Sequence, residues 1–141
     1  MFNEVLFMTK TSLGLEENVE GALCYLLGAI TGILFLVLEK ESDFVKFHAM
    51  QSTVISIILI VVWIVFIILG TILGMIVSII AIFFPPVVVI FGLISILVYL
   101  LIFLGGLVLW ILGMYKAYKG ERYKFPIFGD ITEDLLKKVN I

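Results

Sequence analysis

The chain has 141 residues, of which 63% are hydrophobic and 14% charged, and its formal net charge is −2. Soluble domains carry about 25% charged residues, so this composition excludes an ordinary soluble domain. Two blocks, residues 21–38 and 47–115, contain no Asp, Glu, Lys or Arg, and an apolar run of about 18 or more residues is typical of a transmembrane helix. We therefore expect an all-α, polytopic membrane bundle.

The sequence predicts three parts, which are an N-terminal segment over 1–14, a transmembrane helical domain over 15–120 and a tail over 121–141. The first helix is expected over 15–38, because acidic residues favour its first turn. Gly28 and Gly32 form a small-xxx-small pair inside it, which predicts close packing against another helix. Cys24 is the only cysteine, so we expect a buried, inert thiol without a disulfide partner.

The second helix is expected over 43–84, with Lys46 near its start reaching the lipid headgroups. Its apolar part is about 54 Å long at about 1.5 Å per residue, whereas the hydrocarbon core is about 30 Å thick. The helix therefore either projects beyond the bilayer or breaks near Gly70 and Gly74. Three long spans are the favoured interpretation and four spans the alternative, and the same two glycines also suit helix packing.

Pro85 and Pro86 interrupt the long block and predict a hairpin turn, after which a third helix is expected over 87–118. The basic residues that follow it place the C-terminus in the cytoplasm by the positive-inside bias. The tail contains a short amphipathic helix from Asp130, because apolar residues recur every four positions from Ile131. The expected interfacial anchors are Lys46, Lys116, Tyr118, Lys119, Arg122 and Tyr123.

The polar residues inside the long block are neutral, apart from His48 at its edge. Coupled transporters carry ionisable groups within the membrane, so their absence here argues against that class. Gln51, Ser52 and Ser56 are candidates to line a pore or to contact a neighbouring helix, and hydroxyls that bond back to their own helix are the alternative. His48 and Ser52 lie one turn apart, but no third group orients the histidine, so we expect no enzymatic activity.

The sequence contains no cofactor-binding or metal-binding motif. The partners that we expect are membrane lipid, further copies of the chain in a homo-oligomer and an unidentified protein. The small basic cluster after the last apolar block is too weak to indicate nucleic-acid binding.

Three stretches resemble a known family: residues 21–25 (GALCY), residues 44–52 (FVKFHAMQS) and residues 116–130, which begin KAYKGE. They look like the Tic-twenty-like family of small prokaryotic membrane proteins, which are similar to a component of the chloroplast inner-envelope import machinery. The resemblance implies a helical core. The chloroplast relatives are described as four-spanning, pore-associated translocon subunits, which implies an oligomer and a conduit.

Our first hypothesis is a small oligomeric protein of the cell membrane that crosses it several times and acts as a passive pore or a translocation-type channel subunit. The alternative is a non-conducting membrane scaffold or partner-binding subunit that assembles through its glycine faces. If the pore is lined by neutral side chains, its selectivity between cations and anions would be set by the groups at its two entrances.

Overall fold

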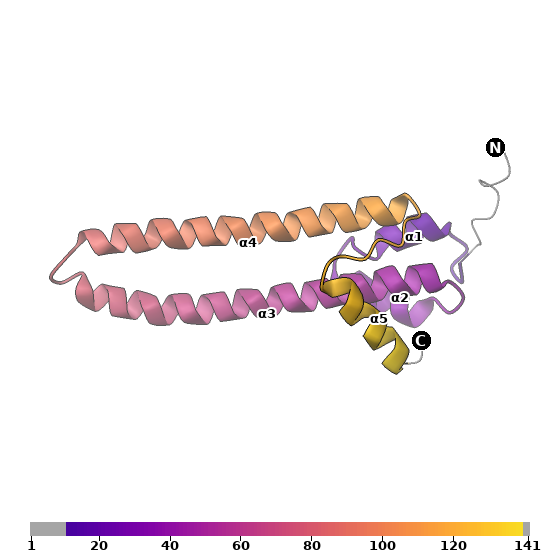
Figure 1. The fold of residues 1–141 in the computed structure, drawn as a ribbon, viewed down its shortest axis with the longest axis horizontal. Coiled ribbons are helices and arrows are strands. Elements are labelled where there is room, and N and C mark those ends of the chain that lie inside the picture. Colours follow the sequence, from indigo (N-terminus) through magenta and orange to yellow (C-terminus); the bar gives the residue numbers. More distant parts are fainter. Residues whose placement is uncertain (1–10, 140–141) are drawn as a thin grey trace. The chain divides into compact units, whose positions relative to one another are not determined.

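The computed structural model describes residues 11–139, which fold into helices and turns without a β-strand. The helices are α1 (Glu17–Leu23), α2 (Ala29–Leu38), α3 (Asp43–Ile80), α4 (Pro86–Tyr118) and α5 (Phe128–Val139), as Figure 1 shows. Two of them, α3 and α4, are long and apolar enough to cross a membrane. The chain divides into two compact units: residues 11–57 with 109–139, which we call the packed unit, and Ile58–Val108, the apolar hairpin.

The single first helix expected over 15–38 is wrong, because the chain breaks between α1 and α2. The break lies at Gly28, whose φ of 60° and ψ of −123° form a conformation that suits glycine. The Thr31 hydroxyl donates to the Cys24 carbonyl oxygen (2.8 Å) and accepts the Leu27 N–H (3.2 Å), so polar backbone groups at the break stay paired. α2 has 10 residues, about 15 Å, which is half of the hydrocarbon thickness.

The second helix, α3, is continuous over 38 residues, so of the two alternatives the unbroken helix is observed and the break near Gly70 and Gly74 is not. It ends at Ile80 rather than at 84, in a turn that leads to Pro85, since a residue before proline disfavours the helical conformation. Residues 43–57 of α3 belong to the packed unit and residues 58–80 to the apolar hairpin. The second part is about 35 Å long, which explains how so long a helix fits a core of about 30 Å.

The apolar hairpin consists of the second part of α3 and the first part of α4, which run antiparallel (Figure 1). Trp63 and Tyr99 meet edge to face with their ring centroids 5.0 Å apart. A Cβ on Gly74 would lie 3.8 Å from the Phe91 ring, which is an ordinary van der Waals contact between the two helices. Most other large side chains on both helices point outward and are exposed, as expected of a surface that faces lipid rather than water.

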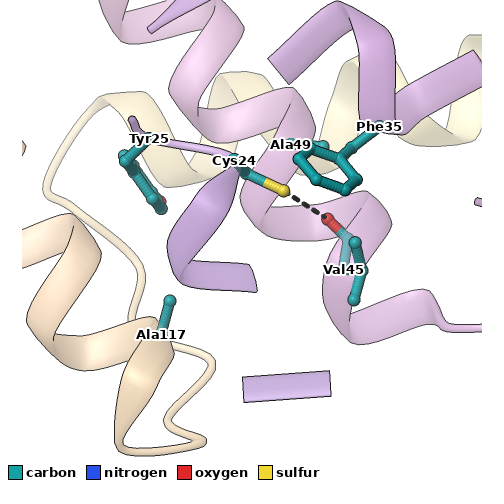
Figure 2. Close-up of a cluster of buried hydrophobic side chains, with 6 residues drawn as sticks. All are labelled: Cys24, Tyr25, Phe35, Val45, Ala49 and Ala117. Carbon is teal, nitrogen blue, oxygen red and sulfur yellow. Dashed lines mark hydrogen bonds between the residues drawn. The ribbon is translucent and has the colours of Figure 1, made fainter. Parts of the chain in front are cut away.

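The core of the packed unit forms where α1, α2, the start of α3 and the end of α4 meet. Its buried members are Cys24, Tyr25, Phe35, Val45, Ala49 and Ala117 (Figure 2). The Cys24 thiol lies 3.2 Å from the Glu20 carbonyl oxygen and 3.9 Å from that of Val45. Small residues at this centre allow the four segments to approach one another closely.

The tail helix α5 begins at Phe128, two residues before the start expected at Asp130. Gly129 and Thr132 are buried on one face, and the Thr132 hydroxyl donates to the Phe128 carbonyl oxygen (2.7 Å). Lys124, which precedes the helix, forms an ion pair with Glu133 (2.6 Å). The helix is thus packed along one face, which accounts for its amphipathic sequence.

Candidate functional site

A chain of hydrogen bonds between side chains runs through the packed unit. The Tyr25 hydroxyl lies 3.1 Å from His48 Nδ1, and Gln51 Nε2 donates to the same hydroxyl (3.0 Å) and to the Tyr123 carbonyl oxygen (3.1 Å). His48 Nε2 lies 3.1 Å from the Glu121 carbonyl oxygen. His48 and Gln51 are fully buried, so these bonds replace the water that the groups would otherwise bind.

The partners fix the direction of each bond. A carbonyl oxygen can only accept, so the contact with Glu121 requires the proton of His48 on Nε2. In a neutral imidazole Nδ1 then accepts, and the Tyr25 hydroxyl must donate to it. The Tyr25 oxygen in turn accepts from Gln51. The result is a directed chain of bonds that ties α3 to the segment between α1 and α2 and to the residues after α4.

Two polar residues of α3 meet the break at Gly28. The Ser52 hydroxyl donates to the Gly28 carbonyl oxygen (3.2 Å), and a Cβ on Gly28 would lie 2.5 Å from Ser56 Oγ. Gly32 lies one turn further along α2, and a Cβ there would lie 2.7 Å from the Ala49 carbonyl oxygen. Both glycines of the predicted pair therefore stand where α2 contacts α3 most closely.

The second predicted pair of glycines lies in the apolar hairpin. Gly74 faces Phe91 of α4, whereas a Cβ on Gly70 would meet nothing within 4 Å. Gly70 therefore leaves an open notch on the surface of α3. In a membrane such a notch allows the backbone of another helix to approach.

The predicted anchors at the end of α4 remain at the surface. Lys116 forms an ion pair with Glu121 (2.7 Å), and the Lys119 ammonium lies 5.7 Å from the Tyr115 ring centroid. The Tyr118 side chain is exposed. These groups surround the point where the helix leaves its apolar stretch.

The other predicted anchors make contacts within the packed unit. Lys46 Nζ donates to the Lys40 carbonyl oxygen (2.8 Å). The Arg122 guanidinium lies 4.6 Å from the ring centroid of the buried Phe47, a cation–π geometry. Tyr123 supplies the carbonyl oxygen that accepts from Gln51.

Sequence reasoning missed the two aromatic residues that complete the polar chain. Tyr25 is buried, and Trp110 Nε1 of α4 donates to its carbonyl oxygen (2.7 Å). A lone tyrosine in an apolar run was the available signal, because a buried phenol needs a partner. Nothing in the sequence pairs Trp110 with a backbone group 85 positions away.

Two acidic residues of the packed unit were also missed. Glu39 follows α2, and its carboxylate accepts from the N–H groups of Ser12, Glu41 and Ser42 and from the Ser12 hydroxyl, at 2.8–3.0 Å. Burial acts to raise the pKa of Glu39, but these donors outweigh it and lower the pKa. Glu20 of α1 is fully buried, and neither carboxyl oxygen has a hydrogen-bond partner within residues 11–139.

The arrangement is one of internal polar contacts. Ser52 bonds to backbone and His48 to Tyr25 and Glu121, so the two do not form a nucleophile and base pair. Across residues 11–139, no three His, Cys, Asp or Glu side chains gather as a group that could hold a metal ion.

Residues 16–132 match the magnetosome magnetite crystal formation protein family. The chain belongs to this family. A membrane protein of Methanocaldococcus jannaschii named UPF0132 is 50% identical over 129 residues, which cover 92% of this chain and 96% of that relative. A second UPF0132 membrane protein from the same organism is 46% identical, and the match covers 86% of this chain and 71% of that relative. A UPF0132 membrane protein from Archaeoglobus fulgidus is 44% identical, and the match covers 84% of this chain and 94% of that relative. No solved structure matches the chain significantly.

Membership of the magnetosome magnetite crystal formation family overturns the resemblance to the Tic-twenty-like family, which is wrong. All three stretches that suggested the resemblance lie within the residues that match. The four-spanning translocon architecture that it implied therefore loses its basis. The relatives' names and the two long apolar helices identify the chain as a membrane protein.

Proposed function

We propose that the protein is a non-conducting membrane scaffold that crosses the cell membrane twice and assembles into homo-oligomers. The observation that carries this proposal is the engagement of His48, Gln51 and Ser52 in bonds within a single chain. These residues are the polar groups that a pore would need along its wall. Both ring nitrogens of His48, the Gln51 amide nitrogen and the Ser52 hydroxyl are bonded inside the packed unit, and only Gln51 Oε1 among these groups lacks a partner within residues 11–139. These bonds favour a structural role over conduction.

The proposed topology follows from length and charge. Residues 58–80 of α3 and 86–108 of α4 are each about 35 Å long, which matches one span with a slight tilt. All nine basic residues lie outside 58–108, so a two-span hairpin places every one of them on the same side. By the positive-inside bias that side is the cytoplasm, and it holds the packed unit and the C-terminus.

Assembly is proposed through the outward surface of the apolar hairpin. Lipid tails are as apolar as the helices, so the hydrophobic effect does not drive helices together within the membrane. Association depends instead on van der Waals packing, which is strongest where small residues let two backbones come close. Gly70 offers such a point, since nothing in the described residues 11–139 lies within 4 Å of a Cβ placed there. The family description concerns magnetite crystal formation, whereas our proposal rests on packing and gives this chain no chemical step or enzymatic activity.

Lipid is the proposed partner of the packed unit as well. Ile30 and Val37 of α2 are 71% and 68% exposed, although both are apolar and lie on a helix too short to span. An exposed apolar face of this kind marks a contact with lipid or with another protein, and we propose lipid here because α2 contains no charged residue. The basic residues at the end of α4 would then contact the headgroups.

Reconstitution into liposomes tests the absence of conduction. We expect purified protein to pass no more ions or small solutes than empty liposomes do, across a range of voltage and membrane tension. A reproducible conductance would overturn the proposal in favour of a pore.

The particle mass of the full chain in mild detergent tests assembly. We expect an oligomer that Gly70→Leu weakens, because a Cβ at this position meets nothing within 4 Å in residues 11–139 and the larger side chain would fill the notch. Ile67→Leu is the matched control, since Ile67 is an exposed apolar residue of the same helix. A monodisperse monomer, or an oligomer equally stable in both variants, would contradict the proposal.

Thiol labelling in intact cells tests the topology. The native Cys24 is fully buried, so an introduced cysteine is the reactive one. We expect Phe83→Cys, in the turn between α3 and α4, to react with a membrane-impermeant reagent from outside. Lys119→Cys should react only after the membrane is permeabilised, and the opposite pattern would refute the orientation.

A further inference from the structure

The segment that contains α1 and α2 begins and ends at the same place. The Ser12 N–H, before α1, donates to Glu39 Oε2 (2.9 Å), and the Ser12 hydroxyl donates to Glu39 Oε1 (3.0 Å). The Lys40 N–H, after α2, donates to the Ser12 hydroxyl (3.0 Å). Residues 12–40 therefore form a closed helical hairpin, which we call the α1–α2 hairpin. Its base lies at these three residues and its tip is the break over residues 24–28.

The tip lies well away from the base along α3. At the base Glu39 accepts from the Ser42 N–H (2.8 Å), whereas at the tip the Gly28 carbonyl oxygen accepts from the Ser52 hydroxyl (3.2 Å). Ser42 and Ser52 are ten positions apart, which is about 15 Å along a helix at about 1.5 Å per residue. The hairpin therefore extends for about 15 Å beside α3.

The contacts of the tip lie close to where the apolar hairpin begins and ends. A Cβ on Gly28 would lie 2.5 Å from Ser56 Oγ, and Trp110 Nε1 donates to the Tyr25 carbonyl oxygen (2.7 Å). Ser56 and Trp110 are each two positions in sequence from the ends of the apolar hairpin, Ile58–Val108. In the proposed two-span topology these positions mark the cytoplasmic boundary of the hydrocarbon core.

The hairpin is polar at its base and apolar at its tip. Residues 21–38 contain no charged side chain, whereas charged residues stand on both sides of this stretch, at Glu17, Glu20, Glu39 and Lys40. Leu26 and Leu27 lie in the tip and are 49% and 61% exposed. This gradient of polarity matches the change from water to hydrocarbon across one side of a bilayer.

The backbone of the tip is paired in the way that a lipid environment requires. All five N–H groups of residues 24–28 donate within the chain, four to backbone carbonyl oxygens and one to the Thr31 hydroxyl. The side chains of Thr31, Ser52 and Trp110 donate to three carbonyl oxygens of the same residues. Irregular backbone at membrane depth is tolerated only where protein groups satisfy it, whereas a loop in water can bond to solvent.

We propose that the α1–α2 hairpin is re-entrant and that its tip, with Leu26 and Leu27, inserts among the acyl chains of the cytoplasmic leaflet. Its base stays in water, and α2 crosses the headgroup layer, which is about 5–8 Å thick on each side of the hydrocarbon core. A hairpin of about 15 Å is long enough for this path. Lipid is the occupant because the exposed tip lacks charge and its contacts lie beside the proposed spans. This inference rests on the proposed two-span topology.

Spin labels on introduced cysteines measure which medium the hairpin contacts. The full chain is reconstituted into vesicles of phosphatidylcholine and phosphatidylglycerol. Each label is then tested for collision with oxygen, which concentrates among acyl chains, and with a water-soluble nickel chelate. Leu27→Cys reports on the tip, and Glu41→Cys is the matched control beside the base, because both side chains are exposed. Wild-type protein should take up little label, since Cys24 is fully buried.

We expect collisions with oxygen to exceed those with the chelate at residue 27 and the reverse at residue 41, with Val37→Cys between them. A preference for the chelate at residue 27 would overturn the proposal, because the tip would then face water. A label there that collides with neither reagent would also overturn it, because protein would then cover the tip. Equal oxygen preference at residues 27 and 37 would overturn insertion by the tip, since α2 would then lie along the membrane surface.

Failure of this inference can be told apart from failure of the proposed function. If the liposomes conduct nothing and Phe83→Cys and Lys119→Cys react from the expected sides, a preference for the chelate at residue 27 refutes only the re-entrant tip. The opposite labelling pattern at residues 83 and 119 would refute the topology, and this inference with it.

Discussion

The contact at Gly32 can be tested by adding a single methyl group. In Gly32→Ala the new Cβ would lie 2.7 Å from the Ala49 carbonyl oxygen and 3.2 Å from the Thr53 amide nitrogen, and closer still to Thr53 Oγ1. Ordinary contacts of a Cβ begin at 3.4 Å. Two of the three neighbours are backbone atoms of α3, which cannot turn away as a flexible side chain could, so α2 must move.

The size of the effect is the difference between two terms. Overpacking of a tight contact costs about 1–3 kcal/mol. Alanine in place of a helical glycine returns about 0.5–1 kcal/mol through lower backbone entropy in the unfolded chain. We therefore expect Gly32→Ala to lower the free energy of unfolding by up to about 2.5 kcal/mol, with a midpoint of about 1 kcal/mol.

Reversible denaturation of the purified chain in mixed micelles measures this loss. Gly70→Ala is the matched control, because a Cβ there meets nothing within 4 Å and only the favourable backbone term remains. We expect the control to equal or exceed the wild type in stability. A Gly32→Ala variant as stable as Gly70→Ala would refute the inference that α2 and α3 are in close backbone contact.

Three further predictions concern buried groups of the packed unit. Tyr25→Phe removes the hydroxyl that bonds to His48 and Gln51, so we expect a loss of about 1–3 kcal/mol in the free energy of unfolding, measured by denaturant titration. The pKa of Glu39 is lowered from 4.5 in the folded chain, so Glu39 stabilises the fold fully above pH 4.5. This stabilisation is lost as the pH falls through the pKa of the folded chain. The melting temperature should therefore fall towards acidic pH in the wild type, and Glu39→Gln should reduce that fall. Burial raises the pKa of the Cys24 thiol, so a maleimide should label Cys24 slowly in the native chain and quickly after denaturation.

Each of these predictions has an outcome that contradicts it. Unchanged stability in Tyr25→Phe would mean that water replaces the lost hydroxyl. A fall towards acidic pH as steep in Glu39→Gln as in the wild type would assign the pH dependence to another group. Equal labelling rates of Cys24 in native and denatured protein would show that α1 opens readily.

The membrane class and most helix positions could be predicted from local sequence. A charge-free apolar block has one stable form in lipid, the helix, because backbone groups find no partner there except within the segment. Pro85 and Pro86 mark the turn because proline lacks the N–H that a continuous helix requires. The third helix, expected over 87–118, is therefore observed as Pro86–Tyr118.

The first helix shows where local sequence fails. The apolar run over 21–38 is long enough to span, yet the chain breaks at Gly28. That break depends on Thr31 and Ser52, whose hydroxyls bond to backbone carbonyl oxygens near it. Ser52 is 24 positions away in the sequence, so only the folded chain brings it to the break.

The sequence by itself determined that the chain is an all-helical membrane protein and which residues are polar within its apolar blocks, because both follow from composition and the cost of burying unpaired backbone. The tertiary structure decided what those residues contact. His48 and Gln51 are buried and bond to groups from distant segments. Whether a buried polar group faces a pore, a partner or its own chain depends on which donor or acceptor the fold places within about 3 Å of it, and no local pattern specifies that.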